Sequence, residues 1–278
     1  MRRNVLQSRF WQGCILILLL PVLSPVIGLA DSKHEYIMGV FPHLPPRELE
    51  KIYAPMAADI SRVIGKPVIF RTSSSYQKFM EQLDNQEFDI AFVQPFDYIR
   101  IADKYGYTPL ATRQEMLSAI LVIQQDSSIQ SIKDLNGKTI ALPPVVAAVS
   151  YLIKNHLLKN GLKTGEDVTI VHTHSHVSCM QKVLSGKADA CGTAAPALRF
   201  FEYKMKVSLR AIGRTRSIPH TLFSIHPRVP AEHVKAIKEL ILGWFKSDKG
   251  KKMLSRGRLK PFRSVSDSDY DVVREIAR

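Results

Sequence analysis

Three common catalytic motifs are missing from this chain. It contains no Gly-x-Ser-x-Gly elbow, no glycine-rich phosphate loop and no His-Glu-x-x-His zinc motif. Asp89 and Asp189 are the remaining candidates for an acid/base pair, yet each lies at the beginning of a predicted strand, away from the end where ligands bind. Capping of the preceding turn is the role that this position favours. We therefore predict a protein that is not an enzyme, with no catalytic residue and no cofactor.

Cysteine is also scarce. Beyond the first thirty residues the chain has only Cys179 and Cys191, one in a predicted helix and one in the strand that follows it. Exported thiols usually pair, and a helix and the next strand can bring two Cα atoms to the ~5.5 Å separation that a disulfide prefers. We expect a disulfide here, and the alternative is a thiol site for a soft metal or a metalloid such as arsenite.

No apolar run near the N-terminus is long enough for a typical membrane helix. The run Cys14–Leu20 is shorter than the ~20 residues that a bilayer crossing needs. Arg2, Arg3 and Arg9 precede it, and Gly28-Leu29-Ala30 follows as a small-x-small cleavage signal. We expect an export signal that is cleaved after Ala30. A retained anchor is the alternative, against which Pro21 and Pro25 argue.

Acidic residues are outnumbered. The chain has 39 Lys and Arg against 25 Asp and Glu, and residues 1–30 hold three of the bases and no acid, so the remaining 248 residues carry a net charge of +11. This charge attracts anions but does not determine the fold. An exported protein rarely meets nucleic acid, so no nucleic-acid partner is expected. The bases between Lys249 and Lys260 are predicted to form a solvated helix face.

Two stretches 100 residues apart share one pattern. Ser75, Met80 and Asp89 recur as Ser175, Met180 and Asp189. Each copy has a β-rich run, a polar loop, a short amphipathic helix and a second strand. Ligands of open α/β sheets bind beyond the carboxyl ends of the strands, near the N-termini of the next helices. The repeat therefore predicts two lobes that face a common cleft, with Tyr76 and His176 pointing into it.

The surrounding pattern extends each repeat into a lobe. Strands and helices alternate over residues 35–104, and a second series begins after the turn at 134–137, which indicates parallel α/β sheets. Residues 116–124 and 221–225 are predicted as two crossing strands that form a hinge. The expected boundaries are 1–30 for the signal peptide, 31–118 for the first part of lobe one, 119–219 for lobe two, and 220–278 for the return to lobe one with the C-terminal helices.

These motifs resemble the phosphonate-, phosphite- and phosphate-binding family of periplasmic substrate-binding proteins of ABC transporters. The resemblance is carried by Tyr76 thirteen residues before Asp89, by His176 thirteen residues before Asp189, and by the segment 132–141. It covers nearly the whole chain after the signal. It implies the α/β fold of type II, or Venus-flytrap, binding proteins, which close on a small oxyanion and present it to a membrane permease.

The sequence also departs from that family. Its phosphonate binders carry a Ser-Thr-Ser-Gly run at the start of the second-lobe helix, whereas residues 145–150 read Val-Val-Ala-Ala-Val-Ser. Backbone amides remain there, but most side-chain hydroxyls are lost. The family's aromatic residue in the crossing strand corresponds to Met116, with Ser118 retained. Its amine-binding acids fall on Pro196 and near His220, so an aminoalkylphosphonate ligand is not expected.

A metal site is a further alternative. His172, His174 and His176 alternate, which on an extended strand would place three imidazoles on one face, and His-x-His spacing suits zinc or copper. The run lies where a strand gives way to a helix, however, and no carboxylate adjoins it. We therefore expect no metal, and His176 alone in the cleft.

The resemblance and the repeat together predict the binding residues. Tyr76 and His176 are expected to donate hydrogen bonds to an anionic oxygen, and the other candidates around them are Ser75, Gln94, Ser118, Ala147, Ala148 and Thr193. The protein is expected to be a periplasmic monomer that delivers its ligand to the permease of an ABC transporter. A membrane sensor kinase is the alternative partner.

Overall fold

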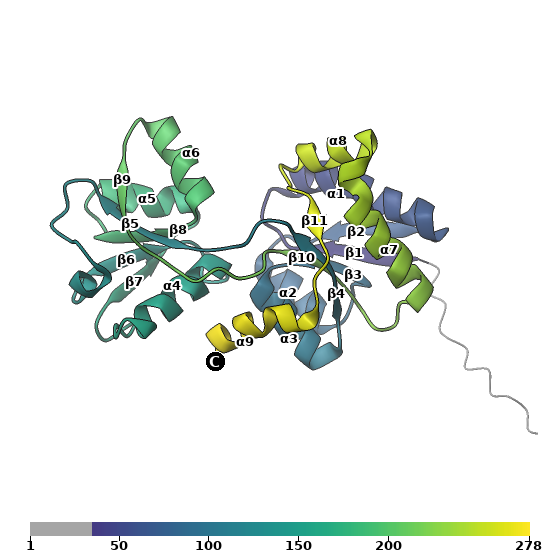
Figure 1. Ribbon diagram of the computed structural model, residues 1–278, viewed down its shortest axis with the longest axis horizontal. Helices are drawn as coiled ribbons and strands as arrows, with labels where there is room; N and C mark the ends of the chain where they lie inside the picture. The colour runs from purple at the N-terminus through teal and green to yellow at the C-terminus, as the bar shows by residue number, and fades with distance from the viewer. Residues whose placement is uncertain (1–34) are drawn as a thin grey trace, which may run out of the picture. The chain divides into compact units, whose positions relative to one another are not determined.

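The computed structural model describes residues 35–278, and the predicted signal segment lies outside them. The described strands form two mixed sheets, each with its own helices (Figure 1). None of the helices in this part of the chain has the length and apolar character that a membrane crossing demands.

The first sheet has the strand order β11-β4-β10-β3-β1-β2. Its strands are β1 (Tyr36–Val40), β2 (Val68–Thr72), β3 (Ile90–Val93), β4 (Thr108–Arg113), β10 (Leu222–Ile225) and β11 (Phe262–Arg263). Strand β1 pairs in parallel with β2 and β3, and β10 runs antiparallel between β3 and β4. Its helices are α1 (Pro46–Ile64), α2 (Tyr76–Asp84), α3 (Pro95–Tyr105), α7 (Ala231–Gly243), α8 (Asp248–Arg256) and α9 (Asp271–Ala277).

The second sheet has the order β7-β6-β8-β5-β9, which repeats the order β2-β1-β3-β10-β4 of the first. Its strands are β5 (Ile120–Gln124), β6 (Thr139–Leu142), β7 (Thr169–His172), β8 (Ala190–Thr193) and β9 (Leu209–Arg214). The helices of this sheet are α4 (Ala148–Lys159), α5 (His176–Leu184) and α6 (Ala195–Met205). Three short 3-10 turns are η1 (Ile132–Leu135), η2 (Trp244–Lys246) and η3 (Asp267–Tyr270).

The repeated residues have repeated structural roles. Ser75 caps α2 by accepting a hydrogen bond from the Lys78 amide at 3.2 Å, and Ser175 caps α5 through the Ser178 amide at 3.1 Å. Equivalent caps therefore begin both helices at corresponding residues of the repeat, Tyr76 and His176.

The repeated aspartates also correspond. The Asp89 carboxylate accepts from the Ile37 amide at 2.8 Å, and the Asp189 carboxylate accepts from the Thr139 amide at 2.8 Å. Each carboxylate therefore ties the start of one parallel strand to its neighbour, rather than capping the preceding turn as predicted. Asp89 also pairs with Arg228.

Strand side chains alternate between the two faces of each sheet. Met38 and Val40 pack with α1, α7 and α8, while Ala91 and Val93 face α2 and α3. In the second sheet Leu142 packs with α4, whereas the adjacent Ala141 packs with α5 and α6. Figure 1 shows α4 on one face of that sheet and α5 with α6 on the other. Each sheet is therefore a layer between helices, as buried strands require.

The chain passes between the sheets through segments 114–119 and 215–221. Leu117 and Ile218 exchange two backbone hydrogen bonds, at 2.8 and 2.9 Å, so the segments pair locally. The predicted crossing strands are shifted: β5 begins only at Ile120, and β10 lies wholly within the first sheet. The bridge at Leu117 leaves few backbone bonds to resist bending, which is a suitable arrangement for a hinge.

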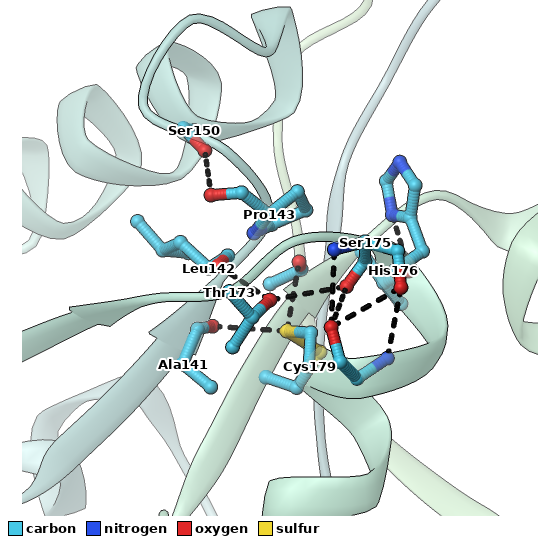
Figure 2. The surroundings of a disulfide bond; sticks show 12 residues. Ala141, Leu142, Pro143, Ser150, Thr173, Ser175, His176 and Cys179 are labelled. Atoms are coloured by element: carbon cyan, nitrogen blue, oxygen red, sulfur yellow. Dashed lines mark hydrogen bonds between the residues drawn. A yellow bond between two sulfur atoms is a disulfide. The ribbon is translucent and has the colours of Figure 1, made fainter. Parts of the chain in front are cut away.

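The two cysteines lie close together on the α5 face of the second sheet. Their Cα atoms are 5.7 Å apart, and their sulfur atoms are joined as a disulfide (Figure 2). Both residues are fully buried. The predicted neighbourhood of helix and strand is therefore present, and the bridge links α5 directly to β8.

Candidate functional site

A cavity of about 240 Å³ lies beyond the carboxyl ends of strands from both sheets. Most of its lining residues come shortly after the ends of β1, β3 and β4 in the first sheet and of β6, β7 and β8 in the second. The lining residues are Phe41, His43, Tyr53, Phe92, Gln94, Pro95, Arg113, Leu117, Ala147, Ala148, Val149, His176, Ala194, His220, Thr221 and Leu259. This is the edge at which open α/β sheets bind ligands.

Arg113 supplies the cavity's permanent positive charge. It is the last residue of β4, and its guanidinium pairs with the nearby Glu115 carboxylate. Two atoms of this pair, Arg113 Nε and Glu115 Oε2, are buried without a hydrogen-bond partner in the described part of the chain. An unpartnered buried donor is costly, and the partly exposed guanidinium of Arg113 lines the cavity.

His220 is held as a neutral hydrogen-bond donor. Its Nδ1 accepts from the Thr221 amide at 2.7 Å, so the proton of the neutral ring resides on Nε2. Burial, and then the charge of Arg113, lower its pKa to about 3. The ring therefore remains uncharged at neutral pH, with an N–H group at Nε2.

His43 presents the opposite tautomer. Its Nδ1 lies 2.9 Å from the Phe41 carbonyl oxygen, which can only accept, so the ring proton resides on Nδ1. Desolvation beside the cavity and the charge of Arg113 lower the pKa of His43, although the Phe41 carbonyl acts against them. When it is neutral, His43 has a lone pair on Nε2, and it donates from that atom only after protonation.

His176 begins α5, as the sequence predicted, and lines the cavity from the second sheet. Figure 2 shows it directly after the capping residue Ser175, on the same helix as Cys179. Its Nδ1 lies 2.9 Å from the Thr193 hydroxyl at the end of β8, and burial lowers its pKa. Thr193 itself is buried and orients the His176 ring.

Gln94 connects the two sides of the cavity. Its Oε1 accepts from the Ala148 amide at 3.1 Å, and its Nε2 donates to the Val146 carbonyl at 3.0 Å and to the Tyr76 hydroxyl at 3.1 Å. Ala148 is the first residue of α4, so the side chain of Gln94 already engages the helix N-terminus where the sequence predicted an anion. An incoming anion competes with this amide oxygen.

The Tyr76 hydroxyl does not point into the cavity as a free donor, as the sequence predicted. Its hydroxyl donates to the buried Asp97 carboxylate and accepts from Gln94, so its single hydrogen is already used. Tyr76 lines a neighbouring cavity, of about 370 Å³, with Phe96 and Tyr151. In this structure it therefore positions Gln94 and does not itself face the Arg113 cavity.

The other predicted residues divide into two groups. Gln94, Ala147, Ala148 and His176 line the Arg113 cavity. Ser75, Ser118 and Thr193 are not among its lining residues: Ser75 caps α2, Thr193 contacts His176, and Ser118 accepts from Arg214 at 3.1 Å. Sequence reasoning missed Arg113, His43 and His220. Arg113 is the last residue of β4, at the same sheet edge where Gln94 follows β3, and a charged residue at such a strand end was the signal that could have identified it.

The alternating histidines do not gather at one site. The Nδ1 atom of His172 lies 2.8 Å from the Pro143 carbonyl oxygen, and His176 contacts Thr193. Within residues 35–278, no group of three His, Cys, Asp or Glu side chains is arranged to hold a metal ion. The strand ends at His172, so the spacing does not place all three rings on one face.

Asp97 gives the site a testable pH dependence. Burial raises its pKa from 3.8 to about 6, although the Tyr76 hydroxyl and the Gln94 backbone act against this. The folded state therefore holds this proton more tightly than the unfolded state. The resulting stability is fully present below about pH 4 and is lost as the pH rises through about 6.

We expect Asp97→Asn to remove this dependence. The quantity to follow is the free energy of unfolding of the native protein minus that of the variant. This difference should decrease by on the order of 2 kcal/mol as the pH rises from about 4 to about 7, since one pKa unit corresponds to about 1.4 kcal/mol. Urea unfolding at both pH values measures the difference. Asp126→Asn, on an exposed loop, is the matched control. A constant difference between Asp97→Asn and the native protein would refute the raised pKa.

Comparison with known proteins adds to this geometry. Residues 38–270 match the family described as "ABC transporter, phosphonate, periplasmic substrate-binding protein". The fold is similar to that of PhnD1 from Prochlorococcus marinus in complex with methylphosphonate, with a TM-score of 0.72, 16% identity and coverage of 88% of this chain and 97% of that one.

Two further structures share the fold. XAC2383 from Xanthomonas citri bound to ATP gives a TM-score of 0.74 with 15% identity, covering 88% of this chain and 96% of that one. A binding protein component of an ABC phosphonate transporter from Pseudomonas aeruginosa gives 0.69 with 16% identity, covering 87% and 85%. The predicted type II binding-protein fold is confirmed.

Proposed function

Because the chain belongs to the periplasmic substrate-binding proteins of phosphonate ABC transporters, we propose that it binds a small phosphonate, phosphite or phosphate in the Arg113 cavity. The observation that carries this proposal is the half-buried Arg113 guanidinium, which lines a cavity together with three histidines. A guanidinium matches the geometry of a tetrahedral oxyanion and retains its charge at any physiological pH.

The size and donors of the cavity support a small anion. Its volume of about 240 Å³ lies below the ~300–1,000 Å³ that is usual for drug-sized ligands. His220 contributes an N–H group, and the Ala148 amide at the N-terminus of α4 contributes a second one when the ligand displaces the Gln94 side chain from it. These donors replace the hydroxyl run that the sequence lacks at residues 145–150.

The lobes are proposed to close around the ligand by bending at segments 114–119 and 215–221. Arg113, His43 and His220 already share one cavity with His176 and the start of α4, and closure would tighten these two sides around the ligand. Delivery to an ABC permease is the family's function, and the findings do not favour a sensor kinase or a metalloid as the alternative. We further propose that the protein acts as a monomer without catalytic activity.

The family's periplasmic location fits two finer proposals. We propose that the signal is cleaved after Ala30, which lies outside the described residues, and that Cys179 and Cys191 form a disulfide after export. The mass of the protein recovered from the periplasm tests both, because cleavage fixes the N-terminus and the bridge removes two hydrogens.

We expect His176→Ala to weaken oxyanion binding by about 1–3 kcal/mol, because the variant removes a buried partner of the ligand. Thermal-shift titration with methylphosphonate, phosphite, phosphate and sulfate measures this loss, since a ligand at ~100 times its dissociation constant stabilises by about 2.7 kcal/mol. His174→Ala, which changes an exposed ring two residues away, is the control. Equal affinity in both variants would exclude His176 from the site.

A further inference from the structure

Helix α6 carries an exposed apolar face. Phe200 and Tyr203 are 52% and 81% exposed, whereas Phe201 of the same helix is buried in the core of the second sheet. Residues three apart lie side by side on a helix, so the two exposed rings are neighbours. Figure 1 shows α6 on the outer side of α5. We call Phe200 and Tyr203 the α6 face.

The charges around the α6 face have one sign. Arg199, Lys204 and Lys206 are all exposed beside it. The sole acidic residue between 195 and 208 is Glu202, and its carboxylate accepts from the Leu209 amide at 3.0 Å. Glu202 is therefore used within the lobe, and the surface around the apolar side chains presents positive charge.

The internal repeat shows that the corresponding positions of the other lobe carry charged, ion-paired residues. A shift of 100 residues places Phe200 and Tyr203 on Arg100 and Asp103 of α3. Arg100 pairs with Asp84 at 2.9 Å, and Asp103 pairs at 2.8 Å with Arg274 of α9, which packs on α3. In the second lobe, the corresponding positions of α6 carry aromatic residues. Among residues 35–278, no helix equivalent to α9 packs on α6.

We propose that the α6 face binds an anionic phospholipid surface. Aromatic side chains settle at the boundary between lipid headgroups and acyl chains, and Lys and Arg beside them are attracted to anionic headgroups. Side chains that protrude from a helix, such as Phe200 and Tyr203, suit a fluid surface that adapts to their shape. Acidic protein surfaces would match the charge but not the protruding aromatic tips, which need preformed pockets.

Such binding goes beyond the capture of an oxyanion. A single face of two aromatic residues with three basic residues beside it supports weak, reversible attachment rather than insertion. Weak attachment would concentrate the protein at the membrane that holds its permease. The α6 face is separate from the Arg113 cavity, so membrane binding and ligand binding should respond to different substitutions.

The test is co-sedimentation of the protein recovered from the periplasm with lipid vesicles. We expect binding to vesicles of phosphatidylglycerol mixed with phosphatidylcholine, and much less to phosphatidylcholine alone. Lys204→Gln with Lys206→Gln should weaken this binding about 10- to 30-fold, since each base near an anionic surface contributes roughly fivefold. Phe200→Ser with Tyr203→Ser should weaken it at least as strongly.

Two controls separate the α6 face from the protein's overall charge. Lys251→Gln with Lys252→Gln removes the same charge from the exposed surface of α8, and Phe245→Ser removes an aromatic ring that is 42% exposed on η2. Equal losses in the α6 variants and the controls would overturn the proposal, as would no binding to phosphatidylglycerol vesicles. Methylphosphonate affinity should be unchanged in the α6 variants, so failure here is distinguishable from failure of the proposed cavity.

Discussion

Arg113→Gln should weaken methylphosphonate binding by about 10- to 150-fold, because a hydrogen bond to a charged group is worth about 1.5–3 kcal/mol. Arg113 is the one Arg or Lys among the cavity's lining residues, and its Nε has no hydrogen-bond partner in the described structure. Isothermal titration calorimetry measures the loss. Arg47→Gln removes the same charge from an exposed position on α1 and is the matched control.

A substitution of Glu115 should have the opposite effect on ligand binding to a substitution of Arg113. Its carboxylate pairs with Arg113 and cancels part of the positive potential in the cavity. Glu115→Gln should therefore tighten methylphosphonate binding, by about fivefold for a charge removed from a partly solvated pair. Weaker binding in this variant would mean that Glu115 chiefly holds Arg113 in position, and the electrostatic explanation would be wrong.

The double variant Arg113→Gln with Glu115→Gln separates binding from folding. Arg113→Gln alone leaves the Glu115 carboxylate, which has a buried oxygen, without its partner, and an unpaired buried charge destabilises the protein. The double variant removes both charges. If it recovers the stability of the native protein but not its affinity, the lost affinity belongs to the guanidinium and not to damaged packing.

The repeated unit was predictable because its signals are local. A serine cap lies three residues from the amide that it accepts from, and the cap fixes where each helix begins. The alternation of apolar residues then fixes which strand faces point inward. These rules act within about ten residues, so the sequence indicated the strands, the helices and the two lobes without knowledge of tertiary contacts.

The composition of the cavity could not be predicted in the same way. His43, Arg113 and His220 are far apart in the chain and meet because β1 and β4 end, and the antiparallel β10 begins, at one edge of the sheet. The Tyr76 hydroxyl illustrates a second difficulty. Its position at the loop-to-helix junction was predicted, but its hydrogen is donated to Asp97, twenty-one residues away on α3. A motif gives the position of a side chain along the chain, while its partner depends on packing.

The backbone pairing of the hinge segments was also not predictable from the sequence. Apolar residues at 116–124 predicted one continuous crossing strand, but before Ile120 the segment pairs only at isolated points, between Leu117 and Ile218 and between Ala119 and Thr215. Neither side of the crossing offers a continuous neighbouring strand there, so the β-prone sequence lacks a ladder to join. Tertiary context overrides β-propensity in such segments.

Replacing Cys179 and Cys191 together by Ala should lower the free energy of unfolding by about 3 kcal/mol, as expected for the loss of a crosslink that closes a short loop. The sequence separation is 12 residues, and both cysteines are fully buried, so the cost includes some packing. Urea unfolding of the native protein, its reduced form and the variant measures the effect. Equal stability of the native protein with and without reductant would show that the thiols are not bridged.

The same bridge should also affect ligand binding, although it lies outside the cavity. It links α5, which begins at His176, to β8, which ends at Thr193, and these two side chains contact each other at 2.9 Å (Figure 2). Loss of the bridge frees the helix to shift relative to the strand, and a small misplacement of His176 weakens its contact with the ligand. We therefore expect the double Ala variant to lose methylphosphonate affinity when it is still folded. The loss should be no larger than that of His176→Ala, because both changes act through one side chain. A greater loss would show that α5 contributes a second contact, through the backbone amides at its N-terminus.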